Sequence, residues 1–413
     1  MEIPQLMSQM LFVVGIALTG LLIERLTRIE TSLACVLAGI GAGLIIPLWQ
    51  FDTGIRASNI HDLVFYIILP VLIFEAAWHI RPRMLRRWLA SVLTLSTLGL
   101  LISSFVIALI LFYAIGHSEG FPWIAALLCG AILSATDPVS VVASLKRQQA
   151  PEDLSTLVEG ESLFNDATAL VLFTVVIAMA TGTESVNDHN NLLLFATVFL
   201  GGLLLGALVG LITAIGVLLF RSSHVANILL VFSAFSSFFI AEHFFHFSGI
   251  MSVVAAALVT RVLLKEHEQQ FLSAVADTWH WLGLLFNTIV FSLMGLVVTL
   301  DMFTEQWLAI AIAIPAVLIA RALSVYGCGW LSRFFRSPVP IGWQHILVWG
   351  GLRGAIGIAL VLSLPVTLPY WWTVQSIVFG VVLFSLFVQG STVRPLIRKY
   401  GSTEKTPQLP AAK

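Results

Sequence analysis

The chain has 413 residues, of which 58% are apolar and only 10% are charged. Soluble domains carry about 25% charged residues, so this composition is typical of an all-α polytopic membrane protein. The formal net charge is -1 and no long basic run occurs, which argues against a nucleic-acid partner. The three cysteines lie in separate apolar stretches and lack metal-ligand spacing, so they predict neither a disulfide framework nor a metal centre.

Apolar stretches of about 20 residues, enough to cross a bilayer, can be read thirteen times along the chain. The sequence predicts about thirteen transmembrane helices, and twelve or fourteen stay open if two neighbours are fused or one is split. Residues 1–400 are expected to form one transmembrane domain, and 401–413 a short cytoplasmic tail. The predicted helices begin near Leu11, Ser32, Asp62, Trp88, Phe121, Val158, Leu192, His224, Ser248, Phe271, Gln306, Ile341 and Trp371.

The Lys and Arg residues predict the orientation. On alternate connections, all but three of the 21 fall on one side, whereas Arg56 falls on the other and Arg321 and Arg353 lie inside predicted helices. Because cytoplasmic loops retain positive charge, the N-terminus is expected outside and the C-terminus inside. Met1 to Met10 lack the positive region of a signal peptide, so the first stretch is expected to stay as a helix.

The fifth predicted helix is interrupted at residues 134–140. Pro138 donates no backbone N–H and clashes with the preceding turn, and Asp137, the residue before proline, is pushed away from helical angles. Non-helical backbone at membrane depth is tolerated only inside protein or along a water-filled cavity. A helix break surrounded by protein is therefore predicted here.

The twelfth predicted helix has a glycine-rich interruption at residues 349–354, which contains Arg353. The two interruptions are seven helices apart, which fits two inverted six-helix repeats, at about 8–181 and 224–400, joined by a linker helix at about 191–220. Inverted repeats with interrupted helices at matching places point to a transporter whose site lies at the membrane midplane. Ordinary kinks at each cluster are the alternative.

The sixth predicted helix carries a polar stripe. Residues at i, i+1, i+4 and i+5 share one helical face, and here these are Glu161, Ser162, Asn165 and Asp166. Charged groups at bilayer depth are costly and mark functional sites by default. The opposite face is apolar and suited to packing, with Leu163, Ala167, Leu170 and Val171.

Oxygen atoms from the two neighbouring helices could hold a sodium ion. Hard cations prefer such ligands, and the carboxylates of Asp137 and Asp166 and the hydroxyls of Thr136 and Ser162 supply them. A carboxylate can bind a proton instead, so competition of Na+ and H+ for Asp166 is enough to couple their exchange. No phosphate-binding loop occurs, and no cofactor is expected.

The two arginines inside predicted helices need counter-charges. Glu161 is expected to pair with Arg353 or Arg321, and the sequence leaves the choice open. Such a pair would keep Glu161 ionised and structural, and Asp166 would be left to titrate.

At these residues the chain resembles the NhaP-type electroneutral branch of the Na+/H+ exchanger family, within the monovalent cation:proton antiporter superfamily. The segment from Gly160 to Asp166 is the most specific match, and the others follow in the family's order over most of the chain. They are 74–76, 135–139, 321–323 and 350–355.

The resemblance implies a homodimer in which a six-helix core moves against dimerisation helices. It implies that Asp166 is the essential ion- and proton-binding carboxylate, with Asp137, Thr136, Ser162 and Glu161 nearby. Asn165, where electrogenic relatives have an aspartate, implies exchange of one Na+ or Li+ for one H+, and Arg321 resembles the basic residue that replaces a lysine of those relatives. Supporting roles are expected for Pro138, Arg353 and Glu75, and the compartment is expected to be a microbial inner membrane.

Other functions stay open at this point. K+/H+ exchange by the same fold, symport of an organic anion, and an intramembrane aspartyl protease with an Asp137–Asp166 dyad are the alternatives. Two outlying clusters are also noted, namely Glu242 with His243 and His246 as a weak metal site, and Asp277 with His280 as solvated helix-end residues.

Overall fold

The chain folds into consecutive helical segments. The computed structural model describes residues 3–45, 63–80, 82–115, 121–181, 191–264, 273–335, 337–368 and 370–401. Within these ranges there are thirteen segments: eight apolar helices long enough to cross a membrane, three shorter apolar helices, and two broken pairs, α7 (Trp123–Ser134) with α8 (Val139–Arg147) and α15 (Ile341–Trp349) with α16 (Ala355–Leu362). The predicted all-α fold class, with breaks in the fifth and twelfth segments, is confirmed.

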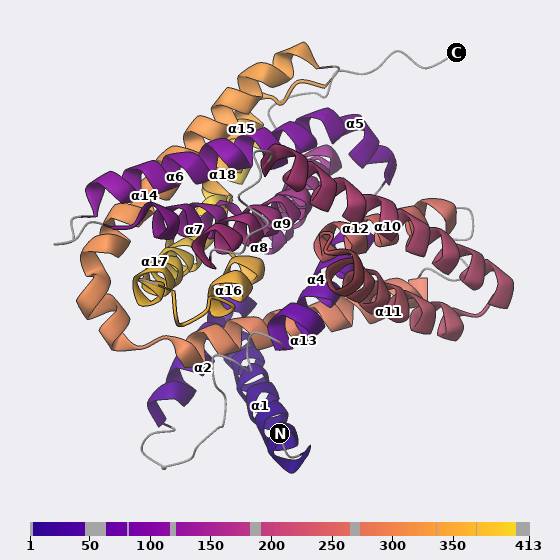
Figure 1. Cartoon of the computed structure of the whole chain (residues 1–413), viewed down its shortest axis with the longest axis horizontal. Helices are drawn as coiled ribbons and strands as arrows, with labels where there is room; N and C mark the ends of the chain where they lie inside the picture. The colour runs from indigo at the N-terminus through magenta and orange to yellow at the C-terminus, as the bar shows by residue number, and fades with distance from the viewer. Residues whose placement is uncertain are drawn as a thin grey trace.

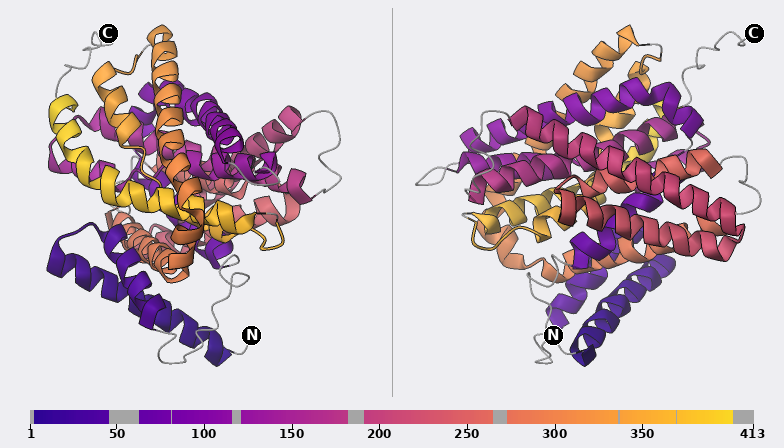
Figure 2. Two further views of the ribbon diagram at one scale, coloured as in Figure 1. Left: turned by 90° about the vertical axis from the view of Figure 1, so that its left-hand side faces the viewer. Right: turned by 45° about the vertical axis from the view of Figure 1, so that its right-hand side comes forward.

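Seven of the segments form one body, here called the panel. Within it α13 packs extensively on α2 and α4, and α12 packs on α10, α11 and α4. The panel occupies the right and lower parts of Figure 1, and both views of Figure 2 place the indigo α1 at the edge of the molecule. Its helices are α1 (Ile3–Thr27), α2 (Thr31–Ile45), α4 (Leu69–His79), α10 (Asn191–Phe220), α11 (Ser223–Phe239), α12 (Gly249–Leu264) and α13 (Ser273–Val297).

The other segments form a second body, here called the bundle. Its longest helix, α14, packs on α6 and α17, and α7 packs on α6 and α9. Both interrupted segments belong to it. Its helices are α5 (Pro82–Thr94), α6 (Leu100–Ala114), α7 (Trp123–Ser134), α8 (Val139–Arg147), α9 (Glu152–Thr181), α14 (Leu300–Leu331), α15 (Ile341–Trp349), α16 (Ala355–Leu362), α17 (Trp371–Phe384) and α18 (Gly390–Tyr400).

The predicted helix starts agree best where a turn residue precedes the helix. Ile341 and Trp371 are the first residues of α15 and α17. In contrast, α9 begins six residues before Val158, at Glu152, because acidic residues in a first turn are favoured by the helix dipole although they are not apolar. The predicted start at Gln306 falls inside α14, on a kink with φ -111° and ψ 20°. The starts near Asp62 and Phe271 lie outside the described residues.

Several crossings contain a π-helical turn that hydropathy does not predict. Each of these turns directly adjoins an α-helix of the same segment. They lie at Val64–Ile68, Leu95–Gly99, Ile240–Phe245 and Ser385–Gln389. Such turns often occur at functional sites. The last of them brings Ser385 next to the break in the twelfth segment.

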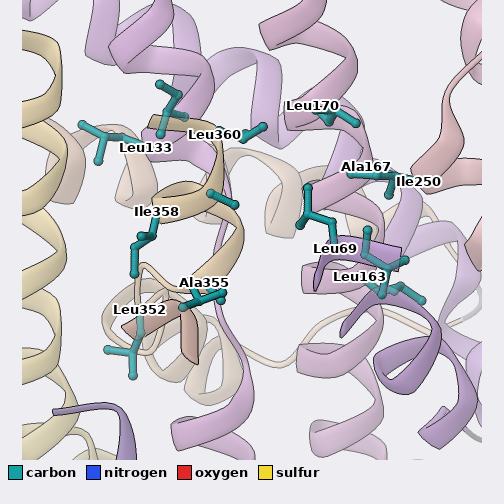
Figure 3. Packing of buried hydrophobic residues seen from close by; sticks show 14 of the residues in the cluster. Leu69, Leu133, Leu163, Ala167, Leu170, Ile250, Leu352, Ala355, Ile358 and Leu360 are labelled. Atoms are coloured by element: carbon teal, nitrogen blue, oxygen red, sulfur yellow. The ribbon is translucent and has the colours of Figure 1, made fainter. Parts of the chain in front are cut away.

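The apolar face of α9 packs into the core, as predicted. Leu163, Ala167, Leu170 and Val171 are all at most 3% exposed. Figure 3 shows three of these side chains on α9, with Leu69 of α4 beside Leu163, while Ile358 and Leu360 of α16 lie on the other side of the view. Burial of one face of α9 turns the polar stripe toward the two breaks.

Candidate functional site

The two interrupted segments meet at their breaks. The backbone N–H of Asp137 donates to the carbonyl of Leu352 across 2.8 Å, the single bridge between two extended strands of backbone in the described residues. Both breaks lie inside protein, as expected for irregular backbone at this depth. Four half-helices, α7, α8, α15 and α16, therefore end or begin around one point.

An arginine meets the C-terminal end of each first half-helix. Arg353 Nη1 donates to the carbonyl of Ala135, just after α7, across 2.9 Å. Arg321 Nε donates to the carbonyl of Leu347, in the last turn of α15, across 3.2 Å. Because the last carbonyls of a helix are unpaired and carry partial negative charge, both cations satisfy groups that each break leaves free.

The second half-helices begin beside the Asp137 side chain. Its Oδ1 accepts the N–H of Val139 at 2.9 Å, in the first turn of α8. Gly354, which precedes α16, lies so close that a Cβ atom there would overlap the Asp137 carboxyl group. The carboxylate thus sits between the positive ends of two half-helices, which favour negative charge.

A buried polar network closes one side of the break. Asn165 Nδ2 donates to Thr136 Oγ1 at 2.7 Å and to Glu161 Oε1 at 3.1 Å, and its Oδ1 accepts the N–H of Thr136. Ser162 Oγ donates to the carbonyl of Thr136. We call these residues, with Arg321, the closed network. Each of its five side chains is at most 6% exposed.

Arg321 is the partner of Glu161. Its Nη1 and Nη2 donate to the two carboxylate oxygens at 2.8 and 2.9 Å, a two-pronged geometry that fixes both side chains. Of the two partners that the sequence left open, the structure selects this one. Arg353 is instead turned toward α7, and its Nε and Nη2 have no hydrogen-bond partner among the residues that the structure describes.

A cavity of about 170 Å³ lies on the other side of the break, between the panel and the bundle. Asp137 and Asp166 line it from the bundle, and Glu75 lines it from α4. It reaches the surface, because its lining includes Val139, which is 53% exposed, and the exposed His280. Thr136, Pro138, Asn287 and residues 354–357 complete most of its wall.

The charged groups that act most strongly on Asp166 are other acids, Asp137 and Glu161. Neither Asp137 nor Asp166 forms an ion pair within the part of the chain that the structure describes. Two acids without basic partners make the cavity attractive to cations.

Of the residues predicted to bind sodium, three line the cavity together: Thr136, Asp137 and Asp166. Ser162 does not. It lines a much smaller space of about 10 Å³ with Glu161 and Arg321, and Thr136 and Asp137 line this space as well as the cavity. The separation arises because the Ser162 hydroxyl donates to the carbonyl of Thr136, although Ser162 and Asp166 differ by only about 40° in direction around the helix.

Two outlying predictions have a different outcome. Glu242 accepts the N–H of Gly249 at 2.8 Å, and the ring of His243 stacks on Phe239. They do not join a three-ligand cluster among the described residues. Asp277 and His280 are exposed, as expected, and His280 also lines the cavity beside Glu75 and His79.

Sequence reasoning missed two residues near the cavity. His79 is the last residue of α4 and precedes an arginine-rich stretch, so the sequence predicts a solvated side chain. Its position four residues after Glu75 places both side chains on one helical face, which could have indicated the contact. Glu30, between α1 and α2, accepts a hydrogen bond from Ser140 of α8. That contact joins the panel to the bundle, and no local sequence pattern predicts it.

Comparisons with known proteins agree on one family. The model of the transmembrane region of sodium/hydrogen exchangers matches residues 12–399. The Na+/H+ antiporter ApNhaP of Aphanothece halophytica is 34% identical over 97% of this chain and 76% of its own length. NhaH, a Na+/H+ antiporter of Halobacillus aidingensis, is 32% identical over 95% of this chain and 97% of its own.

A solved structure has the same fold. The sodium proton antiporter MjNhaP1 of Methanocaldococcus jannaschii superposes with a TM-score of 0.79 and 20% identity, over 96% of this chain and 99% of that one.

Proposed function

The chain belongs to the sodium/hydrogen exchanger family, and from this premise we propose that it exchanges Na+ or Li+ for H+ across the membrane. It is an integral membrane protein and a secondary transporter, not an enzyme. The observation that carries the proposal is the cavity between the panel and the bundle. It holds Asp137 and Asp166, which form no ion pair among the described residues, at the point where the two helix breaks meet.

Asp166 is the carboxylate for which both ions compete. It faces the cavity, its strongest charged neighbours are acids, and it has no basic partner among the described residues. A proton or a sodium ion each neutralises one such charge, so loss of one ion is offset by gain of the other. Asp137 and Thr136 supply further oxygens for Na+, and Ser162 joins them only by turning from the carbonyl of Thr136.

Exchange is electroneutral in this scheme, with one Na+ for one H+. Glu161 is excluded from the charge that moves because Arg321 neutralises it through two hydrogen bonds. Asn165 carries no charge and is held by Thr136 and Glu161. A single titrating carboxylate thus carries either ion, and the net charge of the site is the same in both directions.

Movement of the bundle against the panel would expose the site alternately. The cavity wall is shared, since α4 and α13 come from the panel and Asp137, Asp166 and α16 come from the bundle. With the N-terminus outside and the C-terminus cytoplasmic, the end of α4 and the start of α13 face the cytoplasm, so this conformation is open inward. We place the protein in a microbial inner membrane.

A homodimer is the assembly that we propose. The outer face of α10 is apolar and exposed, including Leu204, Ile212 and Leu219, which are 74%, 62% and 75% exposed. Native mass spectrometry from detergent or lipid nanodiscs should give twice the chain mass. Monomers under all lipid conditions would contradict it.

The central experiment is transport in liposomes that carry a pH gradient. Proton flux is followed by dye fluorescence on addition of Na+, Li+ or K+, with the membrane potential clamped for the Na+ and Li+ runs. Sodium-driven flux that ignores the potential and is lost in Asp166→Asn is the expected result. Asp301→Asn, at the exposed start of α14, is the matched control and should retain the flux.

Other outcomes discriminate among the alternatives. Flux with K+ but not Na+ would replace this proposal by K+/H+ exchange, and flux that follows the membrane potential would exclude the 1:1 stoichiometry. Full activity of Asp166→Asn would remove this carboxylate from the mechanism.

A further inference from the structure

A cluster of two histidines and one glutamate stands at the mouth of the cavity. Glu75 and His79 come from α4 and His280 from α13, and one ligand atom of each lies within 4.8 Å of those of the other two. We propose that these three side chains bind a divalent transition metal ion such as Zn2+. This is the one group of three potential ligands of this kind found in the described residues.

The ligand set fits such an ion better than it fits sodium. Imidazole nitrogen suits Zn2+, Ni2+ and Cu2+, whereas Na+, Mg2+ and Ca2+ prefer all-oxygen sites. Two histidines and one glutamate, with a fourth position left to water, are a common zinc environment. The two histidines thus separate this cluster in chemistry from Asp137 and Asp166 deeper in the cavity.

Two packed helices hold the ligands toward one another. Glu75 and His79 are four residues apart on α4 and so share one face. The neighbouring α13 approaches that face closely at Gly283, where a Cβ atom would lie 2.8 Å from Cδ of Glu75. The absence of a side chain at Gly283 lets Glu75 reach across to His280, one turn earlier on α13.

The hydrogen bonding of His79 prepares one of its nitrogens for a metal. Nδ1 lies 2.9 Å from the carbonyl oxygen of Glu75 and 3.3 Å from Oε1 of the same residue, and the carbonyl can only accept, so Nδ1 carries the proton and Nε2 has the free electron pair. Metal-bound histidines usually donate their other N–H to a carbonyl or carboxylate in this way.

Little movement is needed to close the site. Zn–N bonds of about 2.0–2.1 Å in a tetrahedron place ligand atoms about 3.4 Å apart. The present limit of 4.8 Å is within reach of side-chain rotations. The two imidazole rings are inclined at 69° rather than stacked, with their centres 6.2 Å apart, so both edges can turn to a common ion.

If the protein transports cations as proposed above, an ion bound at this position should inhibit transport. His79 has 37% of its side chain exposed and His280 is exposed, so an ion can arrive from solution. It would place two positive charges beside Glu75, in the wall of the cavity that holds Asp137 and Asp166. Repulsion at the entrance should slow the entry of monovalent cations.

Binding is tested on the purified full chain without any transport assay. Zn2+ is titrated by calorimetry, and Co2+ by visible absorption, into wild type, His79→Gln, His280→Gln and the control His243→Gln, an exposed histidine outside the cluster. We expect one ion per chain in wild type and in the control. In the two cluster variants the affinity for the ion should fall by about tenfold or more. Equal binding by all four proteins, or none by wild type, would overturn the site. Gel filtration and thermal unfolding establish that each variant is folded.

Zn2+ inhibition in liposomes supplies the second readout, scored as a fraction of each protein's own metal-free rate. We expect Zn2+ to inhibit wild type and His243→Gln at similar concentrations. Inhibition of His79→Gln should need a Zn2+ concentration about ten times higher. Binding without any transport would leave the metal site standing and refute the proposed function. Transport without binding would do the reverse.

Discussion

Glu161 and Asp166 lie five residues apart on one helix, and their surroundings are opposite. Glu161 is 2% exposed and bonded through both oxygens to Arg321, with Asn165 as a second partner. Asp166 faces a cavity open to the surface and has acids as its charged neighbours. In the proposed mechanism the helix therefore carries a structural charge and a transporting charge, and the partner of each acid decides its role.

The closed network should fail most severely when one partner is removed. Glu161→Gln leaves Arg321 buried without its counter-charge, and loss of one partner of a buried pair costs about 3–5 kcal/mol. We expect a large fall in the yield of folded protein and in the apparent Tm followed by tryptophan fluorescence.

A double variant separates charge from packing in that result. Glu161→Gln with Arg321→Met removes both charges, so it should recover a clear part of the lost Tm. If the single variant is as stable as wild type, or the double variant is the less stable of the two, Glu161 does not serve as the structural acid.

The cavity side should instead lose function while the fold is kept. In Gly354→Ala the added methyl group must displace the Asp137 carboxyl group, and misplacement of a reacting group by an ångström can cost on the order of a hundredfold in rate. We expect sodium-driven proton flux to fall between about ten- and a hundredfold. Gly327→Ala on α14, where a Cβ meets nothing within 4 Å, is the control and should transport normally. Unchanged flux in Gly354→Ala would show that the position of Asp137 is not critical.

Glu30 gives the smallest effect and a defined pH dependence. Burial, and after it the negative charge of Asp137, raises the pKa of Glu30 from 4.5 to about 7, while Arg394 and Arg147 oppose the rise. The folded chain therefore holds a proton there that the unfolded chain releases above about pH 4.5, so this group's contribution to stability falls as the pH rises to about 7.

The variant Glu30→Gln stays neutral and avoids that loss. Relative to wild type it should gain up to about 3 kcal/mol between pH 5 and pH 8, less whatever solvent screening removes. Apparent Tm values of the two proteins at both pH values measure the gain. A difference that is the same at pH 5 and pH 8 would contradict a raised pKa.

The sequence predicted what depends on local chemistry. The break at Pro138 and the one at Gly350 and Gly351 follow from backbone properties of those residues, and the stripe on α9 follows from helical spacing. The partner of Glu161 could not be predicted, because Arg321 and Arg353 are both intramembrane and only the packing of α14 and α15 places one of them beside it.

Contacts between distant segments were also beyond the sequence. Ser162 shares a stripe with Asp166, but the bond from its hydroxyl to the carbonyl of Thr136 turns it to the closed side. His280 could be read only as a helix-end residue until α4 was placed against α13. Such pairings depend on which helices are neighbours, and hydropathy carries no information about that.

The crossing of the two breaks also bears on how the chain is made. The carbonyl of Ala135 accepts its hydrogen bond from Arg353, 218 residues later in the chain, and the amide of Asp137 is satisfied by Leu352. Until the twelfth segment has been synthesised and inserted, the fifth holds polar backbone that lipid cannot satisfy. During biogenesis the first half must therefore wait, in contact with water or with the insertion machinery, for the second half to complete it.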